Sequence, residues 1–313
     1  MKKNNPFEDF EKKTKFDTFL DNSLQEDVKQ KELFAEPIQT QELVVKGLSI
    51  PNLSQSLLKA YVDYYDENVR GCGLKIRKQY FEKIPSESGE AAKLGIYFEY
   101  LVTNYVRPGD SIPQPKMVYK GTPKEKLSVD YERAQESSIM AKSILKKHGI
   151  EILQVGEYMK HDGCSGISDI RAMWNGEECI IDLKYTALMD DKYSEYGWHT
   201  ESLVYKPKQL LQPIHYKYLV KHIHGIEDVP FYFFIFSSKD PKKAKIIKTN
   251  IQPEHIQLHE DVYIPKIKSY IEFHYKNPEK LEARPQYIRC LECSYFDSCD
   301  MRAEVPLIEK IDY

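Results

Sequence analysis

The sequence predicts one α/β domain with a central mixed sheet flanked by helices. Three observations predict this fold class. Asn175 and Gly176 separate two segments rich in apolar residues, which is the strongest short-range signal for a two-residue hairpin. A continuous apolar run over residues 231–236 has the length and composition of a buried strand. Segments with helical spacing lie before, between and after these strands, and this order is typical of mixed α/β domains.

Residues 1–45 are dense in Lys, Glu, Asp and Gln, and we interpret them as a charged amino-terminal arm. The remaining residues, 46–313, are assigned to one folded domain. Apolar residues at helical spacing predict a helix from about Leu53 that leads into the segment Arg70-Gly-Cys-Gly73. A second helix is expected over residues 90–105, because a Pro-Gly pair follows it.

The other elements are assigned from periodicity and flanking residues. Residues 125–148 are expected to form a polar helix, since basic residues in the last turn and a following Gly149 are typical of a helix C-terminus. The order is completed by a strand at 151–157, a loop at 186–205, a helix from Pro207 to about His222, a strand at 245–249 and a helix at 254–275.

Composition excludes several classes of protein. The net charge of −3 gives no global basic signature, so nucleic-acid binding would have to come from a local patch. No apolar run is long enough to cross a bilayer, and the amino terminus lacks the apolar core of a signal peptide. Six cysteines without an export signal favour reduced thiols or metal ligands over disulfides. We therefore expect a soluble cytoplasmic protein without membrane contacts, and the absence of a Walker-type phosphate loop argues against an ATP motor.

The predicted hairpin places two carboxylates opposite each other. If Asn175 and Gly176 form the loop, counting outward along both strands sets Asp169 opposite Asp182. Directly opposed like charges are destabilising, so a shared divalent cation explains the placement. Lys184 projects from the same face as Asp182, whereas the opposite face is apolar and predicted to pack in the core. That core face carries Ile170, Ala172, Cys179, Ile181 and Leu183. The alternative is a hydrated surface hairpin whose acidic face is partly neutralised by the lysine.

Two helices supply further candidates. Glu99 lies one helical turn after Gly95, so its side chain leans over a position without a side chain, where a carboxylate, a metal or a phosphate has room to approach. Gln212 and Tyr216 are four residues apart on one face of the helix that begins at Pro207. They are candidates to contact a phosphate or to hold the lysine. A solvated glutamate and an ordinary polar helix pair are the alternatives.

Four short motifs occur in a fixed order: Gly95-Ile-Tyr-Phe-Glu99, Asp169, Asp182-Leu-Lys184 and Gln212-Pro-Ile-His-Tyr216. Together they resemble the PD-(D/E)xK nuclease superfamily, in particular its RecB-like exonuclease branch, over roughly residues 53–300. The sequence departs from the pattern at Glu99, where many RecB-like members have His. A carboxylate at that position still suits Mg²⁺ or Mn²⁺.

The resemblance implies a restriction-endonuclease-like core and a set of roles. Glu99, Asp169 and Asp182 would hold one or two divalent cations, with the carbonyl of Leu183 as a further ligand. Lys184 would orient the attacking water or stabilise the charged transition state. Gln212 and Tyr216 complete the set of expected catalytic residues.

Three cysteines near the carboxyl terminus, Cys290, Cys293 and Cys299, have C-x2-C-x5-C spacing and lack a fourth ligand. Cys72, between two glycines far upstream, is a plausible fourth. The pattern is similar to RecB-like nucleases that hold an iron–sulfur cluster with one cysteine before the nuclease motifs and three after them. The resemblance implies a [4Fe–4S] cluster that ties the two ends of the domain together. Zinc is one alternative, because four thiolates suit zinc as well as an iron–sulfur cluster. A group of free thiols is the other.

The leading functional hypothesis is an Mg²⁺- or Mn²⁺-dependent DNA exonuclease that acts on single strands or DNA ends in recombination, repair or phage DNA processing. A helicase or recombination protein is a candidate partner. Tyr193, Tyr196 and Trp198 are candidates for stacking on unpaired bases, with loop packing as the alternative. The competing hypotheses are a non-catalytic DNA-binding scaffold with a nuclease fold and a structure-specific or site-specific endonuclease.

Overall fold

The computed structural model describes residues 48–65, 71–86, 88–119, 125–194, 196–200, 207–286, 290–291 and 293–302. The predicted amino-terminal arm at 1–45 lies outside the described residues. Among the described residues, no helix combines the length and the apolar character needed to cross a bilayer.

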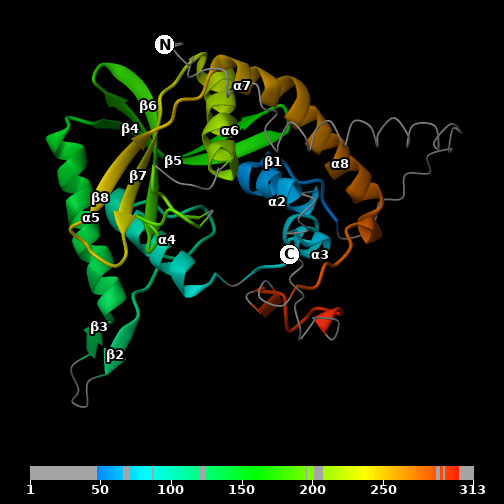
Figure 1. Cartoon of the computed structure of the whole chain (residues 1–313), viewed down its shortest axis with the longest axis horizontal. Coiled ribbons are helices and arrows are strands. Elements are labelled where there is room, and N and C mark those ends of the chain that lie inside the picture. The colour runs from blue at the N-terminus through cyan, green and yellow to red at the C-terminus, as the bar shows by residue number, and fades with distance from the viewer. Residues whose placement is uncertain are drawn as a thin grey trace, which may run out of the picture.

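A six-stranded mixed sheet forms the centre of the protein (Figure 1). Its strands are β1 (Leu53–Ser54), β4 (Glu151–His161), β5 (Cys164–Trp174), β6 (Glu177–Thr186), β7 (Phe231–Ser237) and β8 (Ala244–Lys248). The order is β1-β5-β6-β7-β8, and β4 pairs with β5. The pairs β1–β5 and β6–β7 are parallel, whereas β4–β5, β5–β6 and β7–β8 are antiparallel. The predicted central mixed sheet is therefore confirmed.

Helices cover both faces of this sheet, and Figure 1 shows α5 and α6 on opposite sides of it. The helices are α2 (Gln55–Tyr65), α3 (Gly73–Ile76), η2 (Arg77–Phe81), α4 (Glu90–Thr103), α5 (Val129–Lys147), α6 (Pro207–His224), α7 (Pro253–Leu258), η3 (His259–Tyr263), α8 (Ile264–Lys276) and η4 (Pro278–Lys280). One apolar cluster joins α4 and α5 to the sheet, and a second joins α2, α6 and α8 to its other face.

The predicted hairpin is confirmed. Asn175 and Gly176 have φ values of 54° and 82°, and the type I′ turn requires positive φ at both positions. Trp174 pairs with Glu177, and the ladder between β5 and β6 runs out to the pair Ile170 and Ile181.

The predicted division of β6 into one packing face and one reactive face is only partly correct. Ile181 and Leu183 are buried against α4 and α5, as expected. However, Ile180 on the other face is 1% exposed and joins the cluster of α2, α6 and α8. Because helices cover both faces, only the end of the strand beyond Ile180 is left for polar side chains.

Two element boundaries differ from the sequence prediction. Residues predicted as the first turn of a helix from 125 instead form the strand β3 (Glu125–Leu127), which pairs with β2 (Met117–Tyr119). The helix α5 begins after Ser128, whose backbone is extended, and acidic residues fill its first turn, where the helix dipole favours them. The helix predicted at 254–275 is interrupted by the π-helical turn η3.

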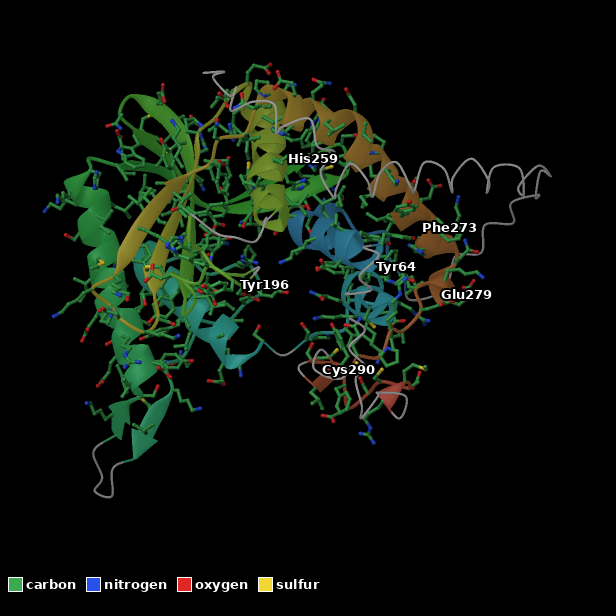
Figure 2. The ribbon with its side chains drawn as sticks, in the orientation of Figure 1. Tyr64, Tyr196, His259, Phe273, Glu279 and Cys290 are labelled. Carbon is green, nitrogen blue, oxygen red and sulfur yellow. The ribbon has the colours of Figure 1, made fainter. Side chains whose placement is uncertain are left out.

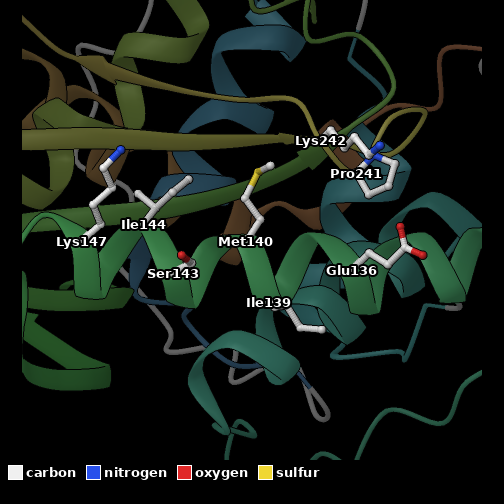
Figure 3. A pocket seen from close by; sticks show the side chains of 8 residues that line it. All are labelled: Glu136, Ile139, Met140, Ser143, Ile144, Lys147, Pro241 and Lys242. Atoms are coloured by element: carbon white, nitrogen blue, oxygen red, sulfur yellow. The ribbon is translucent and has the colours of Figure 1, made fainter.

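A pocket of about 520 Å³ lies between α5 and the turn that joins β7 to β8 (Figure 3). Met140 and Ser143 line it from the helix, and Pro241 and Lys242 line it from the turn. It contains none of the residues assigned to the candidate active site.

Candidate active site

The two strands of the hairpin position Asp169 and Asp182 at the point where their ladder ends. The last pair of the ladder is Ile170 with Ile181, and Asp169 and Asp182 are the next residues outward on the two strands. Oδ2 of Asp169 accepts a hydrogen bond of 2.8 Å from the backbone N–H of Leu183. The side chain of Asp169 therefore bonds the partner strand where the backbone ladder has stopped, and the predicted register is confirmed as far as the pair Ile170 and Ile181.

Asp182 is held by two side chains. It is 4% exposed, its Oδ2 lies 2.6 Å from the ammonium nitrogen of Lys184, and Gln212 donates a hydrogen bond to its Oδ1. The sequence suggested that Gln212 contacts a phosphate or holds the lysine, and in the structure it holds the carboxylate.

Tyr216 lies one helical turn after Gln212 and points toward β5. Its hydroxyl donates a hydrogen bond of 2.6 Å to the carbonyl of Ile167, and its side chain is 8% exposed. Gly166 makes room for the ring, since a Cβ there would lie 2.8 Å from Cε1 of Tyr216. Tyr216 thus docks α6 against the strand that carries Asp169, which differs from the predicted contact with phosphate or lysine.

Glu99 projects from α4 toward the same cluster of charges. Phe98 packs on Tyr185 of β6 with ring centres 4.9 Å apart, which fixes the helix against the strand. A Cβ at Gly95 would meet nothing within 4 Å, so the space one turn before Glu99 is open, as the sequence suggested. Burial raises the pKa of Glu99, the positive charge of Arg107 lowers it, and the negative charge of Asp182 raises it.

The carboxylates repel one another. Burial raises the pKa of Asp169 well above its usual value, and the charges of Asp182 and Glu99 raise it further. Burial alone would lower the pKa of Lys184, but the charges of Asp182 and Asp169 outweigh it and the pKa is raised. The raised pKa favours the protonated form of Lys184, which can donate hydrogen bonds and stabilise negative charge.

The raised pKa of Asp169 predicts a pH-dependent cost to folding. The unfolded chain ionises this group near its ordinary value of 3.8, whereas the folded protein holds the proton to higher pH. Ionisation therefore lowers the free energy of unfolding as pH rises from that value through the raised pKa. Asp169→Asn removes this cost and keeps an acceptor for the Leu183 N–H. We expect the variant to be more stable than wild type at neutral pH in EDTA, with a difference that shrinks toward about pH 4.

Urea unfolding at a series of pH values checks this expectation. Asp261→Asn is the matched control, because Asp261 is exposed on the π-helical turn η3. Equal stability of wild type and Asp169→Asn across the pH range would show that Asp169 carries no such cost.

The donor set suits a hard divalent cation. The carboxylates of Glu99, Asp169 and Asp182 offer oxygen ligands, which Mg²⁺ and Mn²⁺ prefer, and the charges of the other two act on Asp169. As the side chains lie, however, no three His, Cys, Asp or Glu residues in the described ranges are arranged to hold a metal ion. The oxygen ligands of these residues suit a divalent cation, but the side chains are not arranged around one metal position. The expected ligand roles, including that of the Leu183 carbonyl, stay predictions.

Arg107 is a further residue near the site, and it was not predicted from the sequence. It is exposed, and its charge lowers the pKa of both Glu99 and Tyr216, so it lies near both side chains. The ring of Tyr105 covers Gly156, where a Cβ would lie 2.1 Å from Cζ of Tyr105. This contact fixes the segment that presents Arg107. A basic residue directly after the Glu99 helix was the available signal.

The backbone around Cys72 packs closely against the carboxyl-terminal segment. The backbone N–H of Gly73 donates a hydrogen bond of 2.9 Å to the carbonyl of Glu282. A Cβ at Gly73 would lie 2.5 Å from the carbonyl carbon of Leu281, so only glycine fits there. The two glycines beside Cys72 are therefore explained by backbone packing.

Further along, the same two segments stay in contact (Figures 1 and 2). Lys78 donates a hydrogen bond of 2.7 Å to the carbonyl of Ser298, and the hydroxyl of Tyr295 donates one of 2.8 Å to the carbonyl of Ile84. Two ends of the domain thus adjoin. Cys72, Cys290, Cys293 and Cys299 are free thiols and partly exposed, but no three of them converge within the described residues. A cluster or zinc site stays a prediction.

No protein-family model matches this sequence. No curated protein matches it either. Among solved structures, the chain is similar to a crystal structure from Eubacterium rectale named "putative exonuclease", with 17% sequence identity and a TM-score of 0.49. The match covers 89% of this chain and 97% of that chain. A likeness of this degree carries no weight for function, which is inferred below from the site residues.

Proposed function

We propose that the protein is a metal-dependent nuclease that hydrolyses phosphodiester bonds in DNA. One observation supports this most strongly: Asp169 and Asp182 directly follow the last pair of the β5–β6 ladder, the charge of Asp182 acts on Asp169, and the Lys184 ammonium lies 2.6 Å from Asp182. The charge of Glu99 acts on the same group of residues. Like charges gathered in a buried place cost stability, and such costs are typical of sites that bind and react.

The site residues have three proposed roles: metal ligands, a positively charged hydrogen-bond donor, and a residue that positions a ligand. Asp169, Asp182 and Glu99 would hold Mg²⁺ or Mn²⁺, which when bound supplies Lewis acidity to the phosphate and to its attacking water. Lys184, whose raised pKa favours the protonated form, would donate a hydrogen bond to a phosphate oxygen as negative charge builds up in the transition state. Gln212 fixes the orientation of the Asp182 carboxylate, so its role is to position a ligand.

The finer proposal is an exonuclease that acts on single strands or DNA ends, in recombination, repair or phage DNA processing. A helicase or recombination protein is the proposed partner. The ordered set of four motifs in the sequence supports this reading, together with the exposed positive charge of Arg107 near Glu99 and Tyr216.

The experiment is a cleavage assay on end-labelled single-stranded and double-stranded DNA with Mg²⁺, Mn²⁺ or EDTA. We expect cleavage with either cation and none in EDTA. Mononucleotide release from labelled ends indicates an exonuclease, whereas internal fragments from circular DNA indicate an endonuclease. DNA binding without cleavage under every condition would replace the proposal with a scaffold that retains the fold.

Arg107 provides a separate prediction about substrate binding. Its exposed guanidinium lies near Glu99 and Tyr216, where a phosphate of the substrate would enter. We expect Arg107→Ala to raise KM about tenfold with a much smaller change in kcat, since the contact is present in both ground state and transition state. Arg107→Lys should restore part of the loss, because the charge remains without the planar fork. A fall in kcat at unchanged KM would assign Arg107 to the chemical step instead.

We also propose that Cys72, Cys290, Cys293 and Cys299 hold a [4Fe–4S] cluster, with zinc as the alternative. The contacts of Gly73 with Glu282, of Lys78 with Ser298 and of Tyr295 with Ile84 support this proposal, since they bring the two parts of the cysteine pattern into one region. The four thiols would have to draw together by a movement of the carboxyl-terminal segment.

A further inference from the structure

The loop between β6 and α6 has a defined conformation where the structure describes it, at residues 187–194 and 196–200. Oδ1 of Asp191 accepts hydrogen bonds from the backbone N–H groups of Tyr193, at 2.8 Å, and Ser194, at 2.9 Å. Gly197 packs directly on the same residue, since a Cβ there would lie 2.2 Å from the carbonyl oxygen of Asp191. Contacts of the side chain and backbone of Asp191 therefore hold the described residues Tyr193, Ser194 and Gly197 in place.

This loop is anchored on the strand next to the candidate active site. The backbone N–H of Trp198 donates a hydrogen bond of 3.0 Å to the carbonyl of Leu188, and the Trp198 ring packs on Phe233 with ring centres 4.9 Å apart. Phe233 pairs with Asp182 in the parallel ladder between β6 and β7. The ammonium of Lys184 lies 5.9 Å from the centre of the Phe233 ring. The loop thus begins at the residues that carry the proposed chemistry.

Two tyrosines of this anchored loop face solvent. Tyr193 is 76% exposed and Tyr196 is 52% exposed. In contrast, Met189 and Trp198 of the same loop pack into or against the core. A fixed loop that buries two apolar side chains and presents two large rings outward has the form of a binding surface.

A cation accompanies the exposed rings. The ammonium of Lys59 on α2 lies 5.4 Å from the centre of the Tyr196 ring, and Figure 2 shows Tyr196 on the side of the sheet that faces α2. Aromatic rings with nearby lysines are the elements by which proteins bind single strands, since bases stack on the rings and cations attract the phosphates. Trp198, by contrast, is used for packing, so it is not a candidate for stacking.

We infer that Tyr196 and Tyr193 form a stacking platform for unpaired bases of a DNA strand whose backbone enters the candidate active site. Lys59 would attract the phosphate next to the base stacked on Tyr196. This inference rests on the proposed nuclease function for the position of the strand. It adds a preference for unpaired over paired DNA, because a base within a duplex cannot expose its face to a ring.

The experiment measures binding by fluorescence anisotropy of a labelled oligothymidylate, in EDTA and in Ca²⁺, with the full chain. The matched probe is an oligonucleotide of equal length made of abasic sites, which keeps the phosphates and removes the bases. We expect Tyr196→Ala to weaken binding to the thymidylate about tenfold, the scale for one lost stack, and to leave abasic binding unchanged. Tyr196→Phe should retain wild-type affinity, since the ring remains.

Tyr158→Ala is the matched control, because Tyr158 is 58% exposed on β4 and lies outside this loop. Unchanged thymidylate affinity in Tyr196→Ala and in Tyr193→Ala would overturn the inference, as would failure of the wild-type protein to bind either probe. Equal losses on both probes would likewise overturn it, because the rings would then not recognise bases. The proposed function is tested separately by cleavage: base-dependent binding without cleavage would leave the platform standing and remove the nuclease assignment.

Discussion

Asp182→Ala is expected to lower DNA cleavage by roughly 10³-fold or more, on the scale of removing a preorganised electrostatic group from an active site. Asp182 is the point where the other groups meet: Lys184 pairs with one of its oxygens and Gln212 donates to the other. Its loss would remove a ligand of the proposed cation and also release the lysine from its position. No other single substitution in the site is expected to have a larger effect on activity.

The measurement is the rate of release of labelled nucleotides at saturating Mg²⁺, with circular dichroism to confirm the fold. Asp261→Ala serves as the control, because it removes a carboxylate that is exposed on the far helix segment. Lys184→Ala should reproduce the loss. Full cleavage by the Asp182→Ala protein would end the assignment of the site.

The structure changes the expected effect of this substitution on stability. Opposed carboxylates alone would predict that removing either one relieves repulsion. Asp182, however, neutralises Lys184 and accepts the hydrogen bond of Gln212, so its loss leaves two partly buried donors unpaired, at a cost of about 1–3 kcal/mol. Relief of repulsion is instead expected when the charge of Asp169 is removed, because burial and the charges of its neighbours raise the pKa of Asp169.

The parts of the fold that could be predicted depend on local signals. The Asn-Gly turn fixes its own conformation and thereby the register of two strands, so Asp169, Asp182 and Lys184 could be placed from sequence. The short strand β1 could not be predicted, because it pairs with β5 through two residues far away in the chain. The β2–β3 hairpin was missed for a related reason: three-residue strands have too few positions to show a period.

For residues on helices, membership of the site could be predicted more easily than the contacts that each side chain makes. Gln212 and Tyr216 were found by their spacing, but their partners depend on how α6 docks on the sheet, and Gly166 decides that by admitting the Tyr216 ring. Arg107 was missed because its position depends on the contact between Tyr105 and Gly156 on another element. Such contacts between distant segments leave little trace in a single sequence.

Cys293→Ala is expected to destabilise the whole domain if the proposed cluster forms. A cluster held by Cys72 and the three carboxyl-terminal cysteines closes a very long loop, so losing it should cost on the order of 4 kcal/mol. The contacts of Lys78 with Ser298 and of Tyr295 with Ile84 would weaken with it, because they join the same two segments. We therefore expect lower thermal stability and faster proteolysis of residues on both sides of the junction.

Colour and metal content provide the measurement. Anaerobically purified wild-type protein should be brown and contain iron and sulfide, whereas Cys293→Ala should be colourless. Cys179→Ala should stay brown, since Cys179 is 1% exposed in the core and burial raises its pKa to about 11, which keeps it a protonated thiol. Colourless wild-type protein with stoichiometric zinc would show that the four cysteines hold zinc and not a cluster. The proposed role of the site in joining the two segments would still stand. Metal-free protein with four titratable thiols at these positions would exclude both, and the two segments would then be joined by contacts such as those of Gly73, Lys78 and Tyr295.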